Sequence, residues 1–125
     1  MKLKKFEGNP ILSPTDANDW ESLVTCNPGV IYDDGTFYML YRAAGNDAEH
    51  VIRLGLATSK DGFHFERVSD MPAFGPSEDG PDSGCVEDPR IVKYDTEYYI
   101  TYAYRPYSPG PVSYTHLTLP TNSRV

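Results

Sequence analysis

Two stretches of the chain alternate apolar and polar residues with the period of two that is typical of β-strands. Residues 30–32 and 36–43 are rich in β-branched and aromatic side chains, and they flank an Asp-Asp-Gly turn at 33–35. An Asp-Gly pair between two such runs is the strongest short-range signal for a β-hairpin. We therefore predict an antiparallel hairpin at this point of the chain.

The segment that follows shows a second tight turn. Residues 51–59 and 63–68 flank Lys60-Asp61-Gly62, and we expect them to pair as a second hairpin. Two hairpins in tandem give four antiparallel strands in about 40 residues, which is the size of one propeller blade.

A weak internal repeat extends this pattern. Residues 91–105 resemble residues 30–42 in having a strand, an acidic turn and an aromatic strand, about 60 residues further on. A connection rich in Pro, Gly, Asp and Ser lies between them at 69–83. The repeat predicts an all-β fold of antiparallel hairpins that form the first blade and part of the second blade of a β-propeller. A plain antiparallel sandwich stays open as the alternative.

Composition narrows the function classes. The chain has 125 residues, enough for one ordinary domain, and its net charge of −7 argues against nucleic acid or an anionic membrane as the partner. The basic start is not followed by an apolar run, and no stretch is long enough to span a bilayer, so we expect a cytoplasmic protein. Cys26, Cys85 and the three scattered histidines lack metal-ligand spacing, so neither a metal site nor a disulfide framework is predicted.

The stretch from Gly84 to Arg90 holds the most suggestive chemistry. Two adjacent carboxylates, Glu87 and Asp88, precede Pro89, which pushes Asp88 toward an extended conformation. On an extended backbone Asp88 and Arg90 would share one face and Glu87 would point to the other. Asp88 is then either a carboxylate held ready for acid–base work beside a fixed cation or part of an ordinary Asp-Pro turn that leads into a strand with a solvent-facing Arg90.

Three further residues stand out in the first half of the chain. Trp20 is the one tryptophan, and we expect it to pack against the sheet. Asn27 begins a predicted Asn-Pro-Gly turn, where it either bonds its own backbone or presents its amide to a ligand at the mouth of a sheet. Arg42 ends a strand of apolar and aromatic residues, so it needs an anion or carboxylate partner unless it reaches solvent.

The end of the chain does not continue the pattern. Residues 112–125 lack alternation and an acidic turn, and the hexapeptide at 112–117 looks like the translation of a transposon-end adaptor used in sequencing libraries. We expect residues 1–111 to be the N-terminal part of a propeller catalytic domain and residues 112–125 to be non-native.

Taken together, the motifs between residues 6 and 105 closely resemble the N-terminal part of glycoside hydrolase family 130, the β-mannoside phosphorylases. The motifs that carry the resemblance are, in chain order, Asn9-Pro10-Ile11-Leu12, Trp20-Glu21, Asn27-Pro28-Gly29, Leu40-Tyr41-Arg42-Ala43, residues 54–62 and residues 84–90. The resemblance implies a five-bladed β-propeller with a central active site. It also implies inverting phosphorolysis of β-mannosides, such as β-1,4-mannosyl-oligosaccharides, to α-mannose 1-phosphate.

The resemblance also implies roles for individual residues. Asp88 would be the general acid, relayed through a mannose hydroxyl, and Asn27 would bind the mannosyl residue. Arg42 would help to bind phosphate, Arg90 would orient Asp88 or contact substrate, and Glu87 would support the site from behind. No cofactor is implied beyond inorganic phosphate as co-substrate, and the full-length form could be a homo-oligomer.

One protein carboxylic acid suffices for an inverting phosphorylase, because phosphate takes the place of the activated water that an inverting hydrolase generates with a second carboxylate. Basic residues must hold the phosphate, and those beyond Arg42 would come from later blades. A hydrolase on the same propeller remains an alternative, although the early aspartates Asp16 and Asp19 lie in predicted turns, not in a strand. A non-catalytic β-domain that binds sugar through Tyr98 and Tyr107 remains a third.

Overall fold

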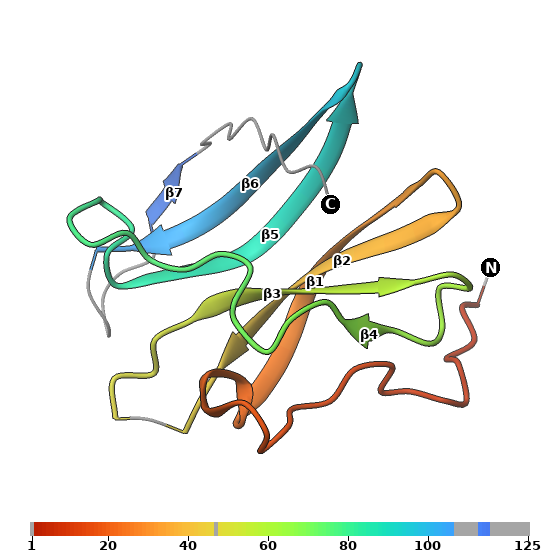
Figure 1. The fold of residues 1–125 in the computed structure, drawn as a ribbon, viewed down its shortest axis with the longest axis horizontal. Coiled ribbons are helices and arrows are strands. Elements are labelled where there is room, and N and C mark those ends of the chain that lie inside the picture. The colour runs from red at the N-terminus through yellow and green to blue at the C-terminus, as the bar shows by residue number, and fades with distance from the viewer. Residues whose placement is uncertain (1, 47, 107–112, 116–125) are drawn as a thin grey trace.

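The computed structural model describes residues 2–46, 48–106 and 113–115, and these form two antiparallel β-sheets (Figure 1). The first sheet has the order β1-β2-β3-β4 and the second the order β5-β6-β7. The elements are a 3₁₀ turn η1 (Asp19–Glu21) and the strands β1 (Val24–Asp33), β2 (Thr36–Ala44), β3 (Arg53–Ser59), β4 (Glu66–Arg67), β5 (Cys85–Tyr94), β6 (Glu97–Arg105) and β7 (Ser113–Thr115). The predicted all-β class and antiparallel hairpins are confirmed.

The first hairpin closes where its sequence predicts, with Asp33 paired to Thr36 across the Asp34-Gly35 turn. Its first strand, however, begins at Val24, so the predicted turn at Asn27 lies inside β1. The register shifts between Cys26 and Gly29, and Asn27 has a left-handed φ of 45°. Asn27 therefore belongs to a β-bulge, in which one strand carries extra residues and bends.

The hairpin of β5 and β6 repeats the hairpin of β1 and β2 with a constant offset of 61 residues. Asn27 corresponds to Asp88, which also precedes a proline, has a left-handed φ of 53° and lies where the register of β5 shifts. The turn residues Asp34 and Asp95 correspond in the same way, with φ of 44° and 56°. The extended conformation predicted for Asp88 is therefore wrong, because this bulge places Asp88 in the left-handed region, which short polar side chains tolerate.

The two sheets pack face to face through β5, which lies against β1, β2 and β3. Leu54, Val86 and Tyr102 form the apolar cluster between them. Gly29 lets the backbones of β1 and β5 come close, because a Cβ there would lie 2.5 Å from the carbonyl oxygen of Pro89. The tips of the two long hairpins point the same way (Figure 1), and Asp33 at one tip accepts hydrogen bonds from Lys93 and Tyr98 of the other.

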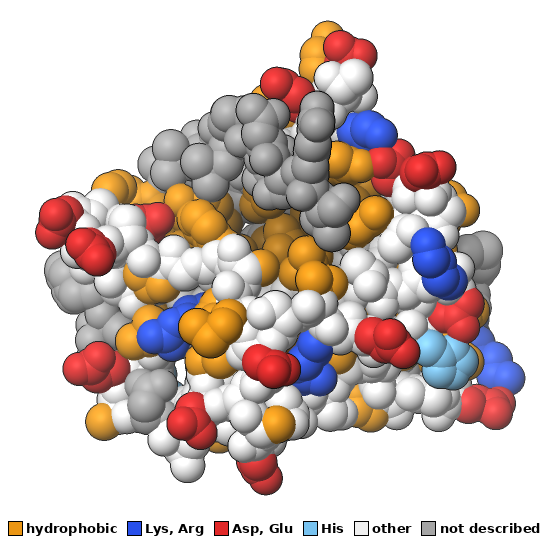
Figure 2. All heavy atoms as spheres, in the orientation of Figure 1, with side chains coloured by type: hydrophobic (Ala, Val, Ile, Leu, Met, Phe, Trp, Pro, Cys, Tyr) orange, Lys and Arg blue, Asp and Glu red, His pale blue; other side chains and the backbone are white. Residues whose placement is uncertain are grey.

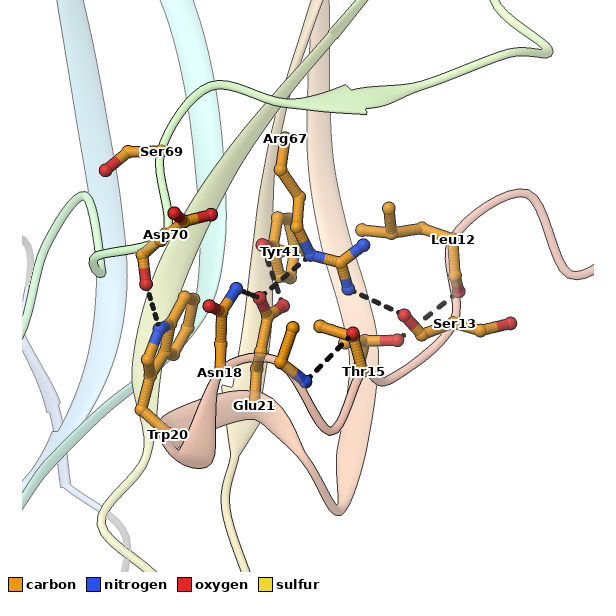
Figure 3. A network of polar contacts seen from close by, with 12 residues as sticks. Leu12, Ser13, Thr15, Asn18, Trp20, Glu21, Tyr41, Arg67, Ser69 and Asp70 are labelled. Atoms are coloured by element: carbon orange, nitrogen blue, oxygen red, sulfur yellow. Dashed lines mark hydrogen bonds and ion pairs between the residues drawn. The ribbon is translucent and has the colours of Figure 1, made fainter.

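The other face of the first sheet is covered by the N-terminal segment. Trp20 packs there with Tyr41, as predicted, at a ring separation of 6.3 Å. The fully buried Glu21 accepts hydrogen bonds from Asn18, Tyr41 and Arg67 at 2.6, 2.9 and 2.8 Å (Figure 3). These bonds satisfy a carboxylate that would otherwise be costly to bury.

The visible face in Figure 2 carries many acidic side chains and few basic ones, in keeping with the net charge of −7. No helix among the described residues is long and apolar enough to cross a membrane. Tyr107 and most of the tail predicted to be non-native lie outside the described residues, and the short strand β7 does not bear on the origin of that tail. Closure into five blades stays a prediction.

Candidate active site

The two bulges bring Asn27 and Asp88 together. They belong to neighbouring strands of different sheets, and the Asn27 Nδ2 donates a hydrogen bond of 2.9 Å to the Asp88 Oδ1. Asn27 is exposed, and the Asp88 side chain is 32% exposed, so both are open to a ligand. The amide of Asn27 thus faces a partner from another strand and not its own turn.

Arg42 reaches the same carboxylate from the middle of the first sheet. Its Nη1 lies 3.1 Å from the Asp88 Oδ1 and 2.6 Å from the Glu87 Oε2. Of the two environments predicted for this arginine, the structure shows the carboxylate partner. Glu87 and Asp88 therefore reach one guanidinium from the same side, and the prediction that they point to opposite faces is wrong because the bulge interrupts the alternation of β5.

Glu87 lies behind Asp88, with only 2% of its surface exposed. A second arginine, Arg105 at the end of β6, places its Nε 2.7 Å from the Glu87 Oε1. This contact is an ion pair without hydrogen-bond geometry, and neither atom has a hydrogen-bond partner among the described residues. Arg105 was not predicted from the sequence. Aligning the two repeats would have drawn attention to Arg105, because the first repeat has a small apolar residue, Ala44, at the position where the second repeat has this charged side chain.

Arg90 lies at the edge of this group. Its Nη1 donates to the carbonyl oxygen of Pro89 at 2.8 Å, and its side chain is exposed. Among the described contacts none joins its guanidinium to the Asp88 carboxylate, although its charge acts on that carboxylate over a longer distance. The Arg90 Nη1 also donates to the backbone carbonyl oxygen of Asp88 at 3.5 Å. Arg90 thus contacts the backbone of Asp88 while its side chain is exposed, and its predicted role in orienting Asp88 or contacting substrate stays a prediction.

Opposing effects act on the charge of Asp88. Burial raises its pKa, but the hydrogen bonds from Asn27 and Arg42 and the charges of Arg42 and Arg90 more than offset this, so the pKa lies below the ordinary value. Burial raises the pKa of the nearby Cys26 thiol, partly opposed by Arg42. Without a ligand, Asp88 is thus held as a carboxylate by groups that a ligand could engage instead.

Comparison with known proteins decides what this site belongs to. The sequence profile of glycoside hydrolase family 130, described as beta-1,4-mannooligosaccharide phosphorylase, matches residues 2–124. The chain belongs to glycoside hydrolase family 130. Two relatives from Thermoanaerobacter sp. (strain X514) are a 1,2-beta-oligomannan phosphorylase, 39% identical over 107 residues, and a beta-1,2-mannobiose phosphorylase, 35% identical over 113 residues.

Each of these matches covers 82% of this chain but 36% and 37% of the respective relatives, so the chain spans little more than a third of their length. A glycosyl hydrolase structure from Bacteroides ovatus is 30% identical, with a TM-score of 0.69 over 88% of this chain and 36% of that one. A second structure was reported with GH130 glycoside hydrolases that target beta-1,2 mannosidic linkages in Candida mannan. It is also 30% identical, with a TM-score of 0.68 and the same coverage.

Family membership favours the interpretation of Asp88 as a carboxylate for acid–base work over its interpretation as part of an ordinary Asp-Pro turn. A half-exposed carboxylate with an amide donor and a cation beside it can exchange a proton with a ligand, which an ordinary turn residue has no reason to do. Among the described residues, no group of His, Cys, Asp and Glu side chains is arranged to hold a metal ion. The arrangement suits recognition of a polyol and an anion around one carboxylate.

Proposed function

We propose that this chain is the N-terminal part of an inverting β-mannoside phosphorylase, in which Asp88 is the general acid and inorganic phosphate is the nucleophile. The observation that carries the proposal is the contact of Asp88 with both Asn27 and Arg42 in a member of family 130. The relatives named above are phosphorylases of mannosides, which supports this reaction class.

The ligand-free contacts suggest how Asp88 acquires its proton. A mannosyl hydroxyl that engages the Asn27 amide and a phosphate that engages Arg42 would each withdraw a group that lowers the pKa of Asp88. A bound phosphate would also raise that pKa by repulsion between like charges. Asp88 would then be protonated when both substrates are present, which is when an acid is needed to protonate the glycosidic oxygen, directly or through a mannose hydroxyl.

Arg42 is the proposed phosphate contact among the described residues, and exposed Arg90 is a second cation within reach of a substrate. Phosphate carries about two negative charges, so more donors are required, and these would come from chain beyond the residues described. The protein is proposed to work in the cytoplasm without an organic cofactor or metal.

The linkage is a finer question. The family description names β-1,4-mannooligosaccharides, whereas both curated relatives are named for β-1,2-linked mannosides. The names of these two relatives favour the β-1,2 linkage over the β-1,4 linkage that the family resemblance implied.

The test uses the full-length enzyme, meaning this chain continued to the length of its relatives. We expect β-1,2- or β-1,4-mannobiose to yield α-mannose 1-phosphate only when phosphate is added, as followed by ³¹P NMR. Asp88→Asn should lower turnover by at least about 10³-fold with the fold intact, since it removes the proton that the leaving group requires. Asp33→Asn is the matched control, because Asp33 is similarly half-exposed and pairs with a cation, Lys93, at 2.7 Å at the far end of its strand. Wild-type phosphorolysis by Asp88→Asn would overturn the assignment.

A hydrolase on the same fold is the second candidate, favoured by the structural relative reported with GH130 hydrolases. It would release mannose at a rate independent of phosphate, so the same assay separates the two reactions. The sugar-binding alternative is less favoured, because Tyr98 is half-buried and its hydroxyl already donates to Asp33.

A further inference from the structure

The buried carboxylate of Glu87 joins two arginines that come from different sheets. Arg42 from β2 lies 2.6 Å from one of its oxygens and Arg105 from β6 lies 2.7 Å from the other. Both arginine side chains are 23% exposed, whereas that of Glu87 is 3% exposed. The result is a row of charges, Arg105–Glu87–Arg42–Asp88, that ends at the proposed acid.

The internal repeat shows that the hairpin itself does not require these charges. In the first repeat, Cys26 occupies the position of Glu87 and Ala44 that of Arg105, while the second repeat has Ala103 in the position of Arg42. Both hairpins nevertheless share their register, their bulge and their left-handed residues. The charged row is thus confined to the junction where the two repeats meet at Asp88.

Such a row of charges is expected to add little to the free energy of unfolding. Removing an acid and its bases from water costs several kcal/mol, and the attraction between them often does no more than offset that cost. Instead, the row of charges fixes the position of the Arg42 guanidinium. With Arg105 on one oxygen, Glu87 offers Arg42 its other oxygen, so one Nη1 of Arg42 remains shared between Glu87 and Asp88.

We propose that Arg105 is a positioning residue, which acts through Glu87 to hold the guanidinium of Arg42 against Asp88. The position of Arg105 follows from these contacts, and the expected effect of Arg105 on phosphate binding rests on the proposed function. Without Arg105, both oxygens of Glu87 are free to bind Arg42, which then turns fully onto Glu87 and leaves Asp88.

The experiment compares Arg105→Ala with wild type in the full-length enzyme, by crystal structure and by steady-state kinetics with phosphate as the varied substrate. Glu87→Gln is a second variant that preserves size while removing the charge that holds both arginines. Arg67→Ala is the matched control, because Arg67 is also 23% exposed and pairs at 2.8 Å with a buried glutamate, Glu21, on the opposite face of the first sheet (Figure 3).

In Arg105→Ala we expect the contact between Arg42 and Asp88 to be lost and the KM for phosphate to rise about tenfold, with a smaller change in kcat, as for loss of one charge-assisted hydrogen bond. In an Arg42→Ala background the same substitution should change the KM less than about twofold, since the residue it positions is absent. Arg67→Ala should lower the melting temperature and leave the KM unchanged.

Unmoved Arg42 in both Arg105→Ala and Glu87→Gln would overturn the inference, as would an equal rise in KM with and without Arg42. A wild-type enzyme that shows no phosphate-dependent turnover would instead refute the proposed function, and the position of Arg42 in the variant structures would then decide the inference alone.

Discussion

Gly29 offers a direct test of how the two sheets create the site. A Cβ at this position would lie 2.5 Å from the Pro89 carbonyl oxygen and 3.2 Å from the Arg90 Cα. Both are backbone atoms, so no side chain can move aside. We expect Gly29→Ala to push β1 away from β5, next to the bulges that carry Asn27 and Asp88.

The required displacement can be worked out from these contacts. Restoring an ordinary contact of at least 3.4 Å means moving the backbones apart by about 0.9 Å. Overpacking of this kind costs about 1–3 kcal/mol, against which alanine regains up to about 1 kcal/mol from the lower entropy of the unfolded chain. The same shift would stretch the 2.9 Å bond from Asn27 to Asp88 toward about 3.8 Å, beyond hydrogen-bond range.

The assay measures thermal unfolding and phosphorolysis of the full-length enzyme. Gly29→Ala should lower the melting temperature by about 2–6 °C and kcat/KM by about 10²-fold, since displacements near 1 Å have costs of that order. Gly75→Ala is the control, because the nearest atom to its Cβ, the Arg53 Cγ, would lie at 3.8 Å. If Gly29→Ala matched Gly75→Ala in both measurements, the argument that close approach of β1 and β5 forms the site would be refuted.

Two further predictions concern stability. Burial and the hydrogen bond to Asp82 raise the pKa of Tyr102 to about 12, above its ordinary value near 10. This phenol therefore contributes about 2–3 kcal/mol of stability that is present below pH 10 and lost as the pH rises to 12. In urea unfolding at each pH, Tyr102→Phe should flatten that decline, and an unchanged decline would contradict this role of Tyr102. The 125-residue chain alone should be inactive and unfold without a sharp transition, because Tyr32 and Tyr94 on the edge strands β1 and β5 are 60% and 75% exposed. A cooperative calorimetric transition together with phosphorolysis by this chain would contradict that expectation.

Much of the fold could be predicted from short stretches of sequence. The Asp34-Gly35 turn and the alternation on both sides of it specify the first hairpin, because turn chemistry and strand period are local properties. The repeat likewise predicted a second aromatic hairpin, which β5 and β6 form. Asn27, Asp88 and Arg42 were identified as candidate residues and the structure brings them together, although their roles remain proposals.

The sequence by itself determined the hairpins with their tight acidic turns and marked Asp88 as a candidate, but the tertiary structure decided which groups surround this carboxylate. Alternation along one strand predicted opposite faces for Glu87 and Asp88, whereas the bulge places both on Arg42. A bulge is a property of two paired strands, and no single strand reveals it. Arg105 was missed for the same reason: its partner Glu87 becomes a partner only when the sheets pack and bury one carboxylate between two guanidinium groups.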